Sequence, residues 1–325
     1  MNQPHDDPHP SGVRVRDLVI GYERADQAVE IVRGISFDVP AGKTLAIVGE
    51  SGTGKSLTAR SLLGLLPPPV RILSGSVTID GLDITQASEV RLRQVRGKHI
   101  SLVPQDPMSA LNPVRRIGSI FSEVLKRHTT LRGGQLLARV SRVLAEVGLQ
   151  ISVLDRYPHQ LSGGMKQRIL IALALVTEPS VVVADEPTTA LDATVQAEIL
   201  DLLIRHVAGR AALVLITHDL GVAATVCERI AVMYSGQIVE EGPMRELLEF
   251  AQHPYTQGLL AAAPDFDSTS ESLVPIPGAP PQPNARPEGC SFRPRCNQAL
   301  PACLSTPALA GGDHRVACWL RAYGD

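Results

Sequence analysis

The feature that most constrains this chain is a glycine-rich loop at residues 49–56, with the sequence GESGTGKS. The loop follows the apolar run 45–48 and leads into a stretch with helical character at 57–63. Glycines between a buried strand and a helix are the context in which a loop binds phosphate. We therefore expect an α/β core with this loop at the end of one of its strands.

Each residue type in the loop suits phosphate binding. Glycines let the backbone curve into a nest whose N–H groups point at phosphate oxygens, and the helix that begins near Lys55 adds the positive end of its dipole. Lys55 supplies a mobile positive charge for the terminal phosphates, and the Ser56 hydroxyl is placed to bind Mg²⁺. The predicted nucleotide contacts in the loop are Gly49, Ser51, Gly52, Gly54, Lys55 and Ser56.

Composition and charge exclude several classes of protein. The formal net charge of −2 argues against a nucleic-acid binder held by bulk electrostatics, and 325 residues suit one large or two modest domains. Residues 1–12 are polar and contain three prolines, which predicts a flexible tail without a signal peptide. The best apolar candidate for a membrane span, 169–176, is too short. We expect a cytoplasmic chain, or one that sits on a membrane through partners.

Residues 13–48 are expected to form strands, because apolar residues alternate at 13–20 and again at 35–39. Tyr22 is expected to end the first of these strands. Its ring could stack on an adenine, since an aromatic face gains energy from stacking, or it could be a half-buried tyrosine of an edge strand. The residues themselves leave both interpretations open.

A block at about 106–165 is expected to be a helical insertion, since apolar residues between 117 and 147 recur at helical spacing. It ends at LSGGMKQR, where Ser162 can cap a helix that starts at Gly163 and Gly164. A helix start with bare backbone N–H groups is a second anion site. One nucleotide rarely needs two such sites from one chain.

Three further polar groups follow predicted strands. The apolar run 181–184 is typical of a central parallel strand and delivers Asp185 and Glu186 at its carboxyl end. Asp185 is predicted to hold Mg²⁺ directly or through water, and Glu186 to act as the general base that activates water. His218 follows the next strand and is predicted to contact the γ-phosphate. Gln105 also stands at a strand end, where on its own it would be a solvated loop residue.

These motifs together resemble those of an ATP-binding subunit of an ABC transporter. The resemblance covers about residues 13–250 and rests on GESGTGKS at 49–56, Gln105, LSGGMKQR at 161–168, VVVADE at 181–186, Ala190-Leu191-Asp192 and His218, in this order. It implies a P-loop NTPase core of the ABC type at 13–251, with a helical subdomain at about 106–165. The remainder, 252–325, would be a C-terminal extension rich in proline and cysteine.

The resemblance also implies how the subunit works. Ser162, Gly163 and Gly164 would contact the ATP bound by a second subunit, so that two domains close head to tail around two nucleotides, and Asp192 would lie where they touch. Gln105 would take part in Mg²⁺ binding and catalysis and couple the closure to helices of the membrane subunits. ATP would stabilise the closed dimer by differential binding, and hydrolysis would let it reopen.

The C-terminal sequence narrows the branch of the family. Three segments are similar to the dipeptide, oligopeptide and nickel importer branch: HPYT at 253–256, PIPG at 275–278 and GCSFRPRC at 289–296. This resemblance implies an ATPase that powers import of peptides, with nickel or another small solute as the alternative. The partners would be two permease subunits, a second ATP-binding subunit of the same or a different kind and, indirectly, an extracytoplasmic solute-binding protein. The place would be the cytoplasmic face of the inner membrane.

Eight prolines lie between 264 and 294, which indicates that the packed core ends and an extended segment begins there. Four cysteines follow, and in a cytosolic chain they suggest metal before disulfides. The candidate ligands are Cys290, Cys296, Cys303 and Cys318.

The spacing of these four cysteines does not include the Cys-x₂₋₄-Cys pairs common in zinc sites, whereas iron–sulfur clusters accept varied spacings. The resemblance implies a [4Fe-4S] cluster, with zinc and four reduced thiols as alternatives. His314 could replace one ligand, and Cys227 is expected to be a buried packing residue.

A different class would be a soluble ABC-type ATPase that acts on nucleic acid or ribosomes. That class favours paired nucleotide domains in one chain, a coiled-coil insertion or a basic surface. The sequence shows none of these, so we expect no nucleic-acid partner.

Overall fold

The computed structural model describes residues 11–24, 27–188, 193–207, 209–263 and 275–322. Its strands form two sheets, one of four strands in the order β2-β1-β4-β5 and one of eight in the order β11-β12-β10-β9-β3-β8-β7-β6. The strands are β1 (Gly12–Arg24), β2 (Gln27–Pro40), β3 (Thr44–Val48), β4 (Arg71–Ile79), β5 (Leu82–Asp83), β6 (Ile100–Val103), β7 (Val181–Asp185), β8 (Ala212–Thr217), β9 (Arg229–Tyr234), β10 (Gln237–Pro243), β11 (Ala310–Gly311) and β12 (Arg315–Val316).

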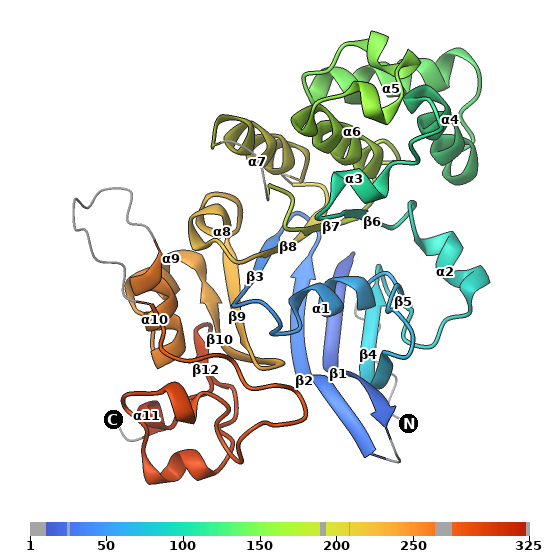
Figure 1. Ribbon diagram of the computed structural model, residues 1–325. Coiled ribbons are helices and arrows are strands. Elements are labelled where there is room, and N and C mark those ends of the chain that lie inside the picture. The colour runs from blue at the N-terminus through green and yellow to red at the C-terminus, as the bar shows by residue number, and fades with distance from the viewer. Residues whose placement is uncertain (1–10, 25–26, 189–192, 208, 264–274, 323–325) are drawn as a thin grey trace, which may run out of the picture.

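The helices divide into those around the sheets and those set apart from them. Figure 1 shows α4, α5 and α6 together at one end of the molecule, beyond β6 and β7. The helices are α1 (Lys55–Ser61), α2 (Glu89–Val95), α3 (Pro107–Ala110), α4 (Ile117–His128), α5 (Gly134–Glu146), α6 (Gly163–Leu175), α7 (Ala193–Val207), α8 (Leu220–Val226), α9 (Met244–Glu249), α10 (Pro254–Ala262) and α11 (Trp319–Ala322). The stretch 117–147, where the sequence predicts helices, contains α4 and α5.

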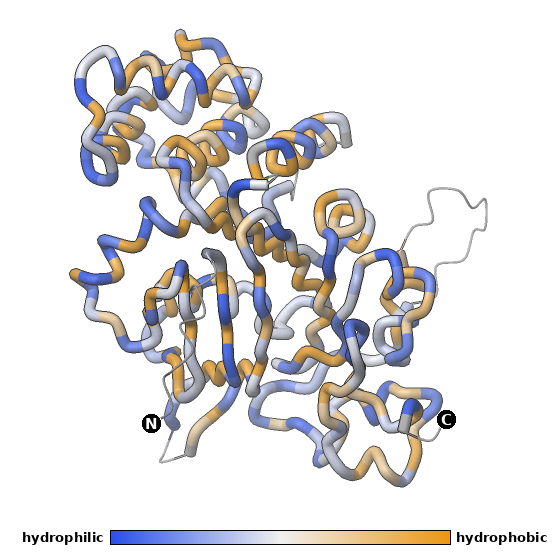
Figure 2. Tube along the Cα trace, turned by 180° about the vertical axis from the view of Figure 1, so that it is seen from behind, coloured by the Kyte–Doolittle hydropathy of each residue, from blue (hydrophilic) through white to orange (hydrophobic). Residues whose placement is uncertain are grey.

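The central strands β9, β3, β8, β7 and β6 run parallel, which explains their continuous apolar sequences. Side chains of β3 alternate between the two faces: Ala46 and Val48 pack in one hydrophobic cluster, and Leu45 and Ile47 in the other. Figure 2 shows the apolar central strands as a continuous orange band. Parallel strands place their carboxyl ends at one edge, so the loops after β3, β6, β7 and β8 meet there.

The C-terminal part departs from the sequence-based expectation. The packed core does not end before the proline-rich segment, because Tyr255 and Phe292 belong to the main hydrophobic cluster and β12 pairs antiparallel with β10. Burial of two large aromatic side chains stabilises this packing, and pairing with β12 covers an edge of β10 that would otherwise be unpaired. The described residues of 252–325, called the extension below, are therefore packed against the sheet.

Within the part of the chain that the structure describes, no helix is long and apolar enough to cross a membrane.

Candidate functional site

The glycine loop lies between the end of β3 at Val48 and the start of α1 at Lys55, as the sequence predicts. Gly49 has φ 154° and Gly54 has φ 106°. A Cβ atom at Gly49 would overlap the backbone oxygen of Met233 on β9. The loop thus runs directly against the neighbouring strand, and only glycine fits at its first position.

Lys55 is buried, with 5% of the residue exposed, and its ammonium group donates to the backbone oxygens of Gly49 at 2.7 Å and Glu50 at 2.9 Å. Burial lowers the pKa of Lys55, and the nearby carboxylates of Glu186, Asp185 and Glu50 oppose that shift. The Lys55 ammonium group therefore lies at the base of the loop, on the side of the Asp185 and Glu186 carboxylates. From there it can reach a phosphate group by rotation of its flexible stem.

Asp185 ends β7, is 6% exposed and accepts a hydrogen bond of 3.1 Å from the Ser56 hydroxyl. Burial raises the pKa of Asp185, while the Ser56 bond works in the opposite direction. A hydroxyl and a carboxylate that already meet provide two oxygen ligands of the type that Mg²⁺ prefers. This pair fits the predicted metal site.

Glu186 follows Asp185 with φ 47°, a left-handed conformation that points its side chain to the edge of the sheet. Its Oε2 accepts a hydrogen bond of 2.8 Å from the Gln105 amide, and its Oε1 lies 3.3 Å from Nδ1 of His218. Gln105 follows β6 and His218 follows β8. The structure thus brings together all three residues that the sequence proposes for catalysis.

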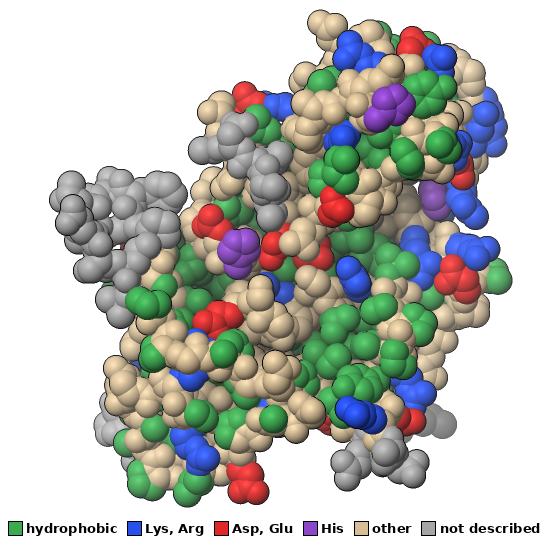
Figure 3. Space-filling model, in the orientation of Figure 1, with side chains coloured by type: hydrophobic (Ala, Val, Ile, Leu, Met, Phe, Trp, Pro, Cys, Tyr) green, Lys and Arg blue, Asp and Glu red, His purple; other side chains and the backbone are tan. Residues whose placement is uncertain are grey.

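Figure 3 shows acidic, basic and histidine side chains gathered at the centre of one face, in the hollow between the helical end and the sheets. Three strand ends and the glycine loop supply the polar groups of this edge. It is the candidate nucleotide site.

The helix start that the sequence predicts to be a second anion site lies at α6, apart from the glycine loop. Ser162 caps α6, accepting a hydrogen bond of 3.3 Å from the backbone N–H of Met165, as predicted. Ser162 and Gly163 are exposed, and a Cβ at Gly163 would meet nothing within 4 Å. Among the described residues, no hydrogen bond joins this helix start to the glycine loop. The start of α6 is therefore exposed and makes no contact of this kind with the loop of its own chain.

Two predicted contacts remain open. Tyr22 does not end its strand but lies inside β1, opposite Val29 of β2, and is half-buried. The bulged β1–β2 pairing continues beyond Tyr22 to Arg24, which lies opposite Gln27. Asp192, with Ala190 and Leu191, lies outside the described residues.

Glu50 was not singled out by the sequence analysis, yet it is the loop residue with most partners. Its backbone N–H donates to the Tyr255 hydroxyl at 2.9 Å, and its carboxylate pairs with Arg295. The partners lie 205 and 245 positions away, so no local pattern reports these contacts. The only signal was an acidic residue in a loop that should attract phosphate.

One of the four cysteines of the extension, Cys303, accepts a hydrogen bond of 3.4 Å at its sulfur from the backbone N–H of Leu300. Burial raises the pKa of the Cys290, Cys296 and Cys318 thiols, and the neighbouring cysteines raise it further. The four side chains are therefore close enough to interact electrostatically.

This cysteine group is nevertheless not arranged as a closed ligand set. Within the described ranges, no three His, Cys, Asp or Glu side chains stand where they could hold one metal ion. The donor chemistry suits a thiolate-bound cluster, since backbone N–H groups stabilise thiolates, but the sulfurs are not drawn together around one point.

The other two predictions about this region have clear outcomes. Cys227 is a buried packing residue as predicted, and burial raises the pKa of its thiol to about 12. His314 is not placed to replace a cysteine, because Nε2 lies 2.8 Å from Glu240 and Nδ1 lies 3.2 Å from Glu246. Those carboxylates of β10 and α9 hold the ring against the sheet.

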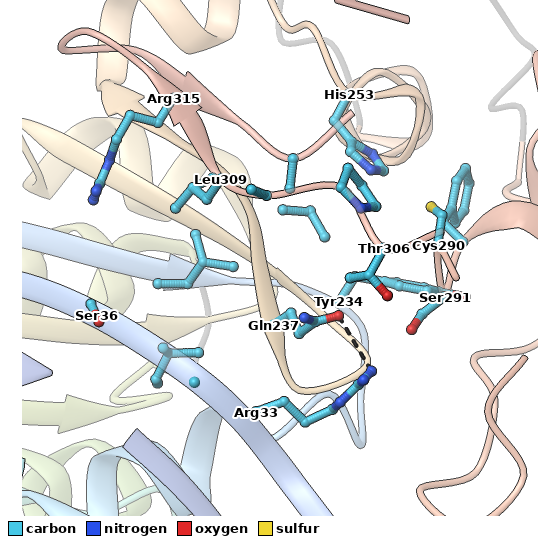
Figure 4. Close-up of a pocket in the computed structure, with 18 of the residues that line it drawn as sticks. Arg33, Ser36, Tyr234, Gln237, His253, Cys290, Ser291, Thr306, Leu309 and Arg315 are labelled. Atoms are coloured by element: carbon cyan, nitrogen blue, oxygen red, sulfur yellow. Dashed lines mark hydrogen bonds between the residues drawn. The ribbon is translucent and has the colours of Figure 1, made fainter. Parts of the chain in front are cut away.

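A cavity of about 450 Å³ lies between β2, the β9–β10 hairpin and the extension. Figure 4 shows Cys290, Ser291 and His253 on one side of it, and Arg33 bonded to Gln237 on the other. None of the catalytic-edge residues lines it. It is a seam between the core and the extension, separate from the candidate nucleotide site.

A glycine loop that leads into a helix, a Ser–Asp pair for Mg²⁺ and a carboxylate between a glutamine and a histidine define a P-loop nucleotide hydrolase of the ATP-binding cassette type. Residues 32–189 match the family model described as ABC transporter, and residues 239–303 match the model described as oligopeptide/dipeptide transporter, C-terminal region. Solved cassettes have the same fold. A dimeric post-hydrolysis structure of the ATP-binding cassette MJ0796 bound to ADP and Pi aligns with a TM-score of 0.64 at 26% identity, over 72% of this chain and 99% of that one.

Curated relatives match nearly the whole chain. The dipeptide transport ATP-binding protein DppD of Bacillus subtilis is 42% identical over 94% of this chain and 94% of the relative. The oligopeptide transport ATP-binding protein OppD of Escherichia coli is 42% identical over 91% and 89%. The chain belongs to this family of ABC transporter ATP-binding proteins, and it is an ATPase.

Proposed function

We propose that this chain is the subunit that powers ABC-type import of peptides by hydrolysing ATP. The observation that carries the proposal is the meeting of Glu186, Gln105 and His218 at the sheet edge where the Ser56–Asp185 pair lies. The names of the relatives and the match of the extension to a peptide-transporter region favour peptides as the solute. Nickel or another small solute is the second candidate, since the chain itself touches no cargo.

The residues of the sheet edge divide the work of hydrolysis. The loop glycines, Ser51 and Lys55 bind the phosphates, and Tyr22 stacks on the adenine. Ser56, Asp185 and Gln105 would hold Mg²⁺, which would neutralise phosphate charge. Glu186 accepts a proton from the attacking water, and His218 contacts the γ-phosphate and orients that carboxylate. Apart from Tyr22, which lies in β1, each side chain reaches its place from the end of a parallel strand, from the loop after one or from the start of α1.

The exposed start of α6 is proposed to complete the site of a second ATP-binding subunit. Ser162, Gly163 and Gly164 would bind the γ-phosphate of the nucleotide held by the partner, and Asp192 would lie at the contact between the two. Support comes from the open N–H groups of that helix and their separation from the loop of the same chain. ATP then acts as a bridge, and its hydrolysis releases the two subunits from one another.

The domain organisation and location follow from the same family. We propose a tail at 1–12, an ABC domain at 13–251 with its helical subdomain at about 106–165, and the extension at 252–325. The chain would sit at the cytoplasmic face of the inner membrane, bound to two permease subunits, with a solute-binding protein on the other side.

The cysteine group is proposed to hold a [4Fe-4S] cluster, through Cys290, Cys296, Cys303 and Cys318. Support comes from the four-thiol donor set, from the backbone N–H that Leu300 donates to Cys303 and from the electrostatic interaction among the thiols. The thiols would have to close around the cluster, because they do not stand as a ligand set on their own. Nothing in the hydrolysis above requires it.

The test is purification of the tagged full chain from its native membranes in mild detergent, with mass spectrometry of the proteins that accompany it. Two multi-span permeases and a solute-binding protein are expected. Uptake of a radiolabelled dipeptide by cells that carry the Glu186→Gln variant should then fall to the level of cells without the chain. Recovery of only ribosomal or other soluble partners, or undiminished uptake, would overturn the proposal.

A further inference from the structure

Glu50, the second residue of the glycine loop, connects that loop to the extension through every polar group it has. Its carbonyl oxygen accepts hydrogen bonds of 2.9 Å from Lys55 Nζ and from the Thr53 hydroxyl, both inside the loop. Its backbone N–H donates to the Tyr255 hydroxyl, and its carboxylate binds Arg295. The carbonyl group of Glu50 faces the inside of the glycine loop, and its N–H and carboxylate face the extension.

The ion pair between Arg295 and Glu50 is built for a fixed geometry. Nη1 lies 2.7 Å from Oε2 and Nη2 lies 2.9 Å from Oε1, so the guanidinium group holds both carboxylate oxygens. Only 5% of the Arg295 side chain is exposed, and it lies over the rings of Tyr234 and Phe292. Its Nε donates to the backbone oxygen of Pro277 at 2.8 Å. Because Pro277 and the two aromatic rings hold the Arg295 guanidinium group in place, it leaves the Glu50 carboxylate little freedom to rotate.

Tyr255 makes the second connection from the extension. Its ring is fully buried between Tyr234 and Phe292, with ring centroids 4.6 and 5.4 Å away, and its hydroxyl is thereby held in place. The N–H of Glu50 is committed to this hydroxyl. The first turn of the loop is therefore anchored through backbone and side chain by residues that follow Glu50 by 205 and 245 positions.

We propose that Arg295 and Tyr255 are positioning residues of the nucleotide site, which hold Glu50 so that the glycine loop keeps the curvature that phosphate needs. This rests on the proposed role of the loop in binding ATP. Neither residue is one of the predicted nucleotide contacts; both act through Glu50. The extension is then a structural part of the ATP site, rather than an appendage that carries cysteines.

The proposal predicts that loss of these contacts changes KM for ATP and leaves kcat unchanged. A loop that is not held must be ordered when the nucleotide binds, and that entropy cost lowers affinity. The phosphates are held by the loop both before and during the reaction, so the loss is uniform. A uniform loss raises KM and leaves kcat unchanged.

The variants are Arg295→Met, Glu50→Gln, their combination, Tyr255→Phe and the conservative Arg295→Lys, all in the full chain. The matched control is Arg293→Met, because Arg293 lies in the same short 3-10 turn and its side chain makes no hydrogen bond or ion pair among the described residues, while its backbone bonds are kept in the variant. ATPase kinetics give KM and kcat, calorimetric titration with Mg-ADP gives Kd, and a thermal melt reports stability.

Arg295→Met, Glu50→Gln and Tyr255→Phe should each raise KM for ATP and Kd for Mg-ADP about tenfold, with kcat within about twofold. The double variant should be no worse than the more affected single one, since both break the same pair. Arg295→Lys should recover part of the loss, and Arg293→Met should match the wild type. Where Arg295→Met does not fold, Arg295→Lys and Tyr255→Phe carry the test.

Unchanged KM and Kd in the folded variants, or a change in kcat alone, would overturn the inference, and so would single effects that multiply in the double variant. A lower melting temperature with unchanged Kd would mean that the pair only stabilises the fold, which also overturns it. The Lys55→Ala variant tests the phosphate-binding role of the loop separately from the positioning role of Arg295. Wild-type Mg-ADP binding by Lys55→Ala would refute the role of the loop itself, whereas loss of binding there with normal Arg295 variants would refute only the positioning role.

Discussion

The amide nitrogen of Gln105 donates a hydrogen bond of 2.8 Å to Oε2 of Glu186. The two residues follow neighbouring parallel strands, β6 and β7, and stand 81 positions apart in the chain. Gln105 also begins the segment that leads into α3 and the helical end of the molecule. A movement of that helical end would therefore shift the position of the carboxylate directly, without any change in the sheet.

The first prediction concerns Glu186→Gln. The amide keeps the size of the side chain but cannot accept a proton, so kcat should fall by about 10²- to 10⁴-fold. Affinity for Mg-ATP should stay within about threefold of the wild type, because the loop and the Ser56–Asp185 pair are untouched. Glu249→Gln, which alters only a surface pair with Arg245, is the control. Turnover above a tenth of the wild-type rate would contradict the role of Glu186 as base.

A second prediction compares two glycines of the loop. Gly49→Ala places a Cβ atom on the backbone oxygen of Met233, whereas Gly52→Ala meets nothing within 4 Å and strains only its own φ of 80°. Strain of that kind costs about 1–2 kcal/mol, and a clash with a strand backbone costs more. Urea unfolding should show a loss of about 1–2 kcal/mol for Gly52→Ala and a clearly larger one for Gly49→Ala. Equal losses would mean that the loop can move away from β9.

The third prediction is a pH dependence of stability that comes from His253. The residue is 2% exposed, burial lowers its pKa to about 4, and its Nδ1 accepts a hydrogen bond from the Tyr255 backbone N–H. Between pH 6.5 and 4 the unfolded chain binds a proton that the folded chain excludes. The free energy of unfolding therefore falls as the pH falls through this window.

For His253 this amounts to about 2 kcal/mol between pH 7.5 and pH 5. His253→Asn keeps a side chain that can cap α10 and removes the titration. Urea midpoints at the two pH values should differ less for His253→Asn than for the wild type. If both chains lose the same stability, the imidazole is protonated in the folded state.

Much of the candidate site could be predicted because its parts are local. The glycine loop, the Asp185–Glu186 pair and His218 each follow an apolar strand directly, and parallel strands end at one edge. The cap at Ser162 is equally local, since it depends on a bond three residues along the chain. Geometry of this kind depends on residues that are neighbours in the chain, so a sequence pattern can predict it.

The rest depends on contacts between distant segments. Glu50 is an ordinary acidic residue until Arg295 and Tyr255 are placed beside it. The pairing of β12 with β10 involves two residues of each strand, too few to give a periodic signal. The prolines of the extension were interpreted as the end of the core, because composition reports on backbone flexibility and not on where two buried aromatic rings are placed.

The last prediction concerns the cysteine group, where the sequence proposes a [4Fe-4S] cluster and the side chains as placed do not form a ligand set. If the cluster is present, the thiols close around it, and chain purified without oxygen should contain about four iron and four sulfide per molecule and absorb near 400 nm. Cys296→Ser should lose that iron, because three thiolates and a hydroxyl hold a cluster poorly. Cys227→Ser is the matched control, since Cys227 is buried in the α/β core and should leave the iron content unchanged. ATPase activity at saturating ATP should survive in both variants, because no step of hydrolysis passes through the cysteines. Stoichiometric zinc would instead mean that the thiols hold a different metal, and no metal in chain that hydrolyses ATP normally would mean that this part of the extension packs without one.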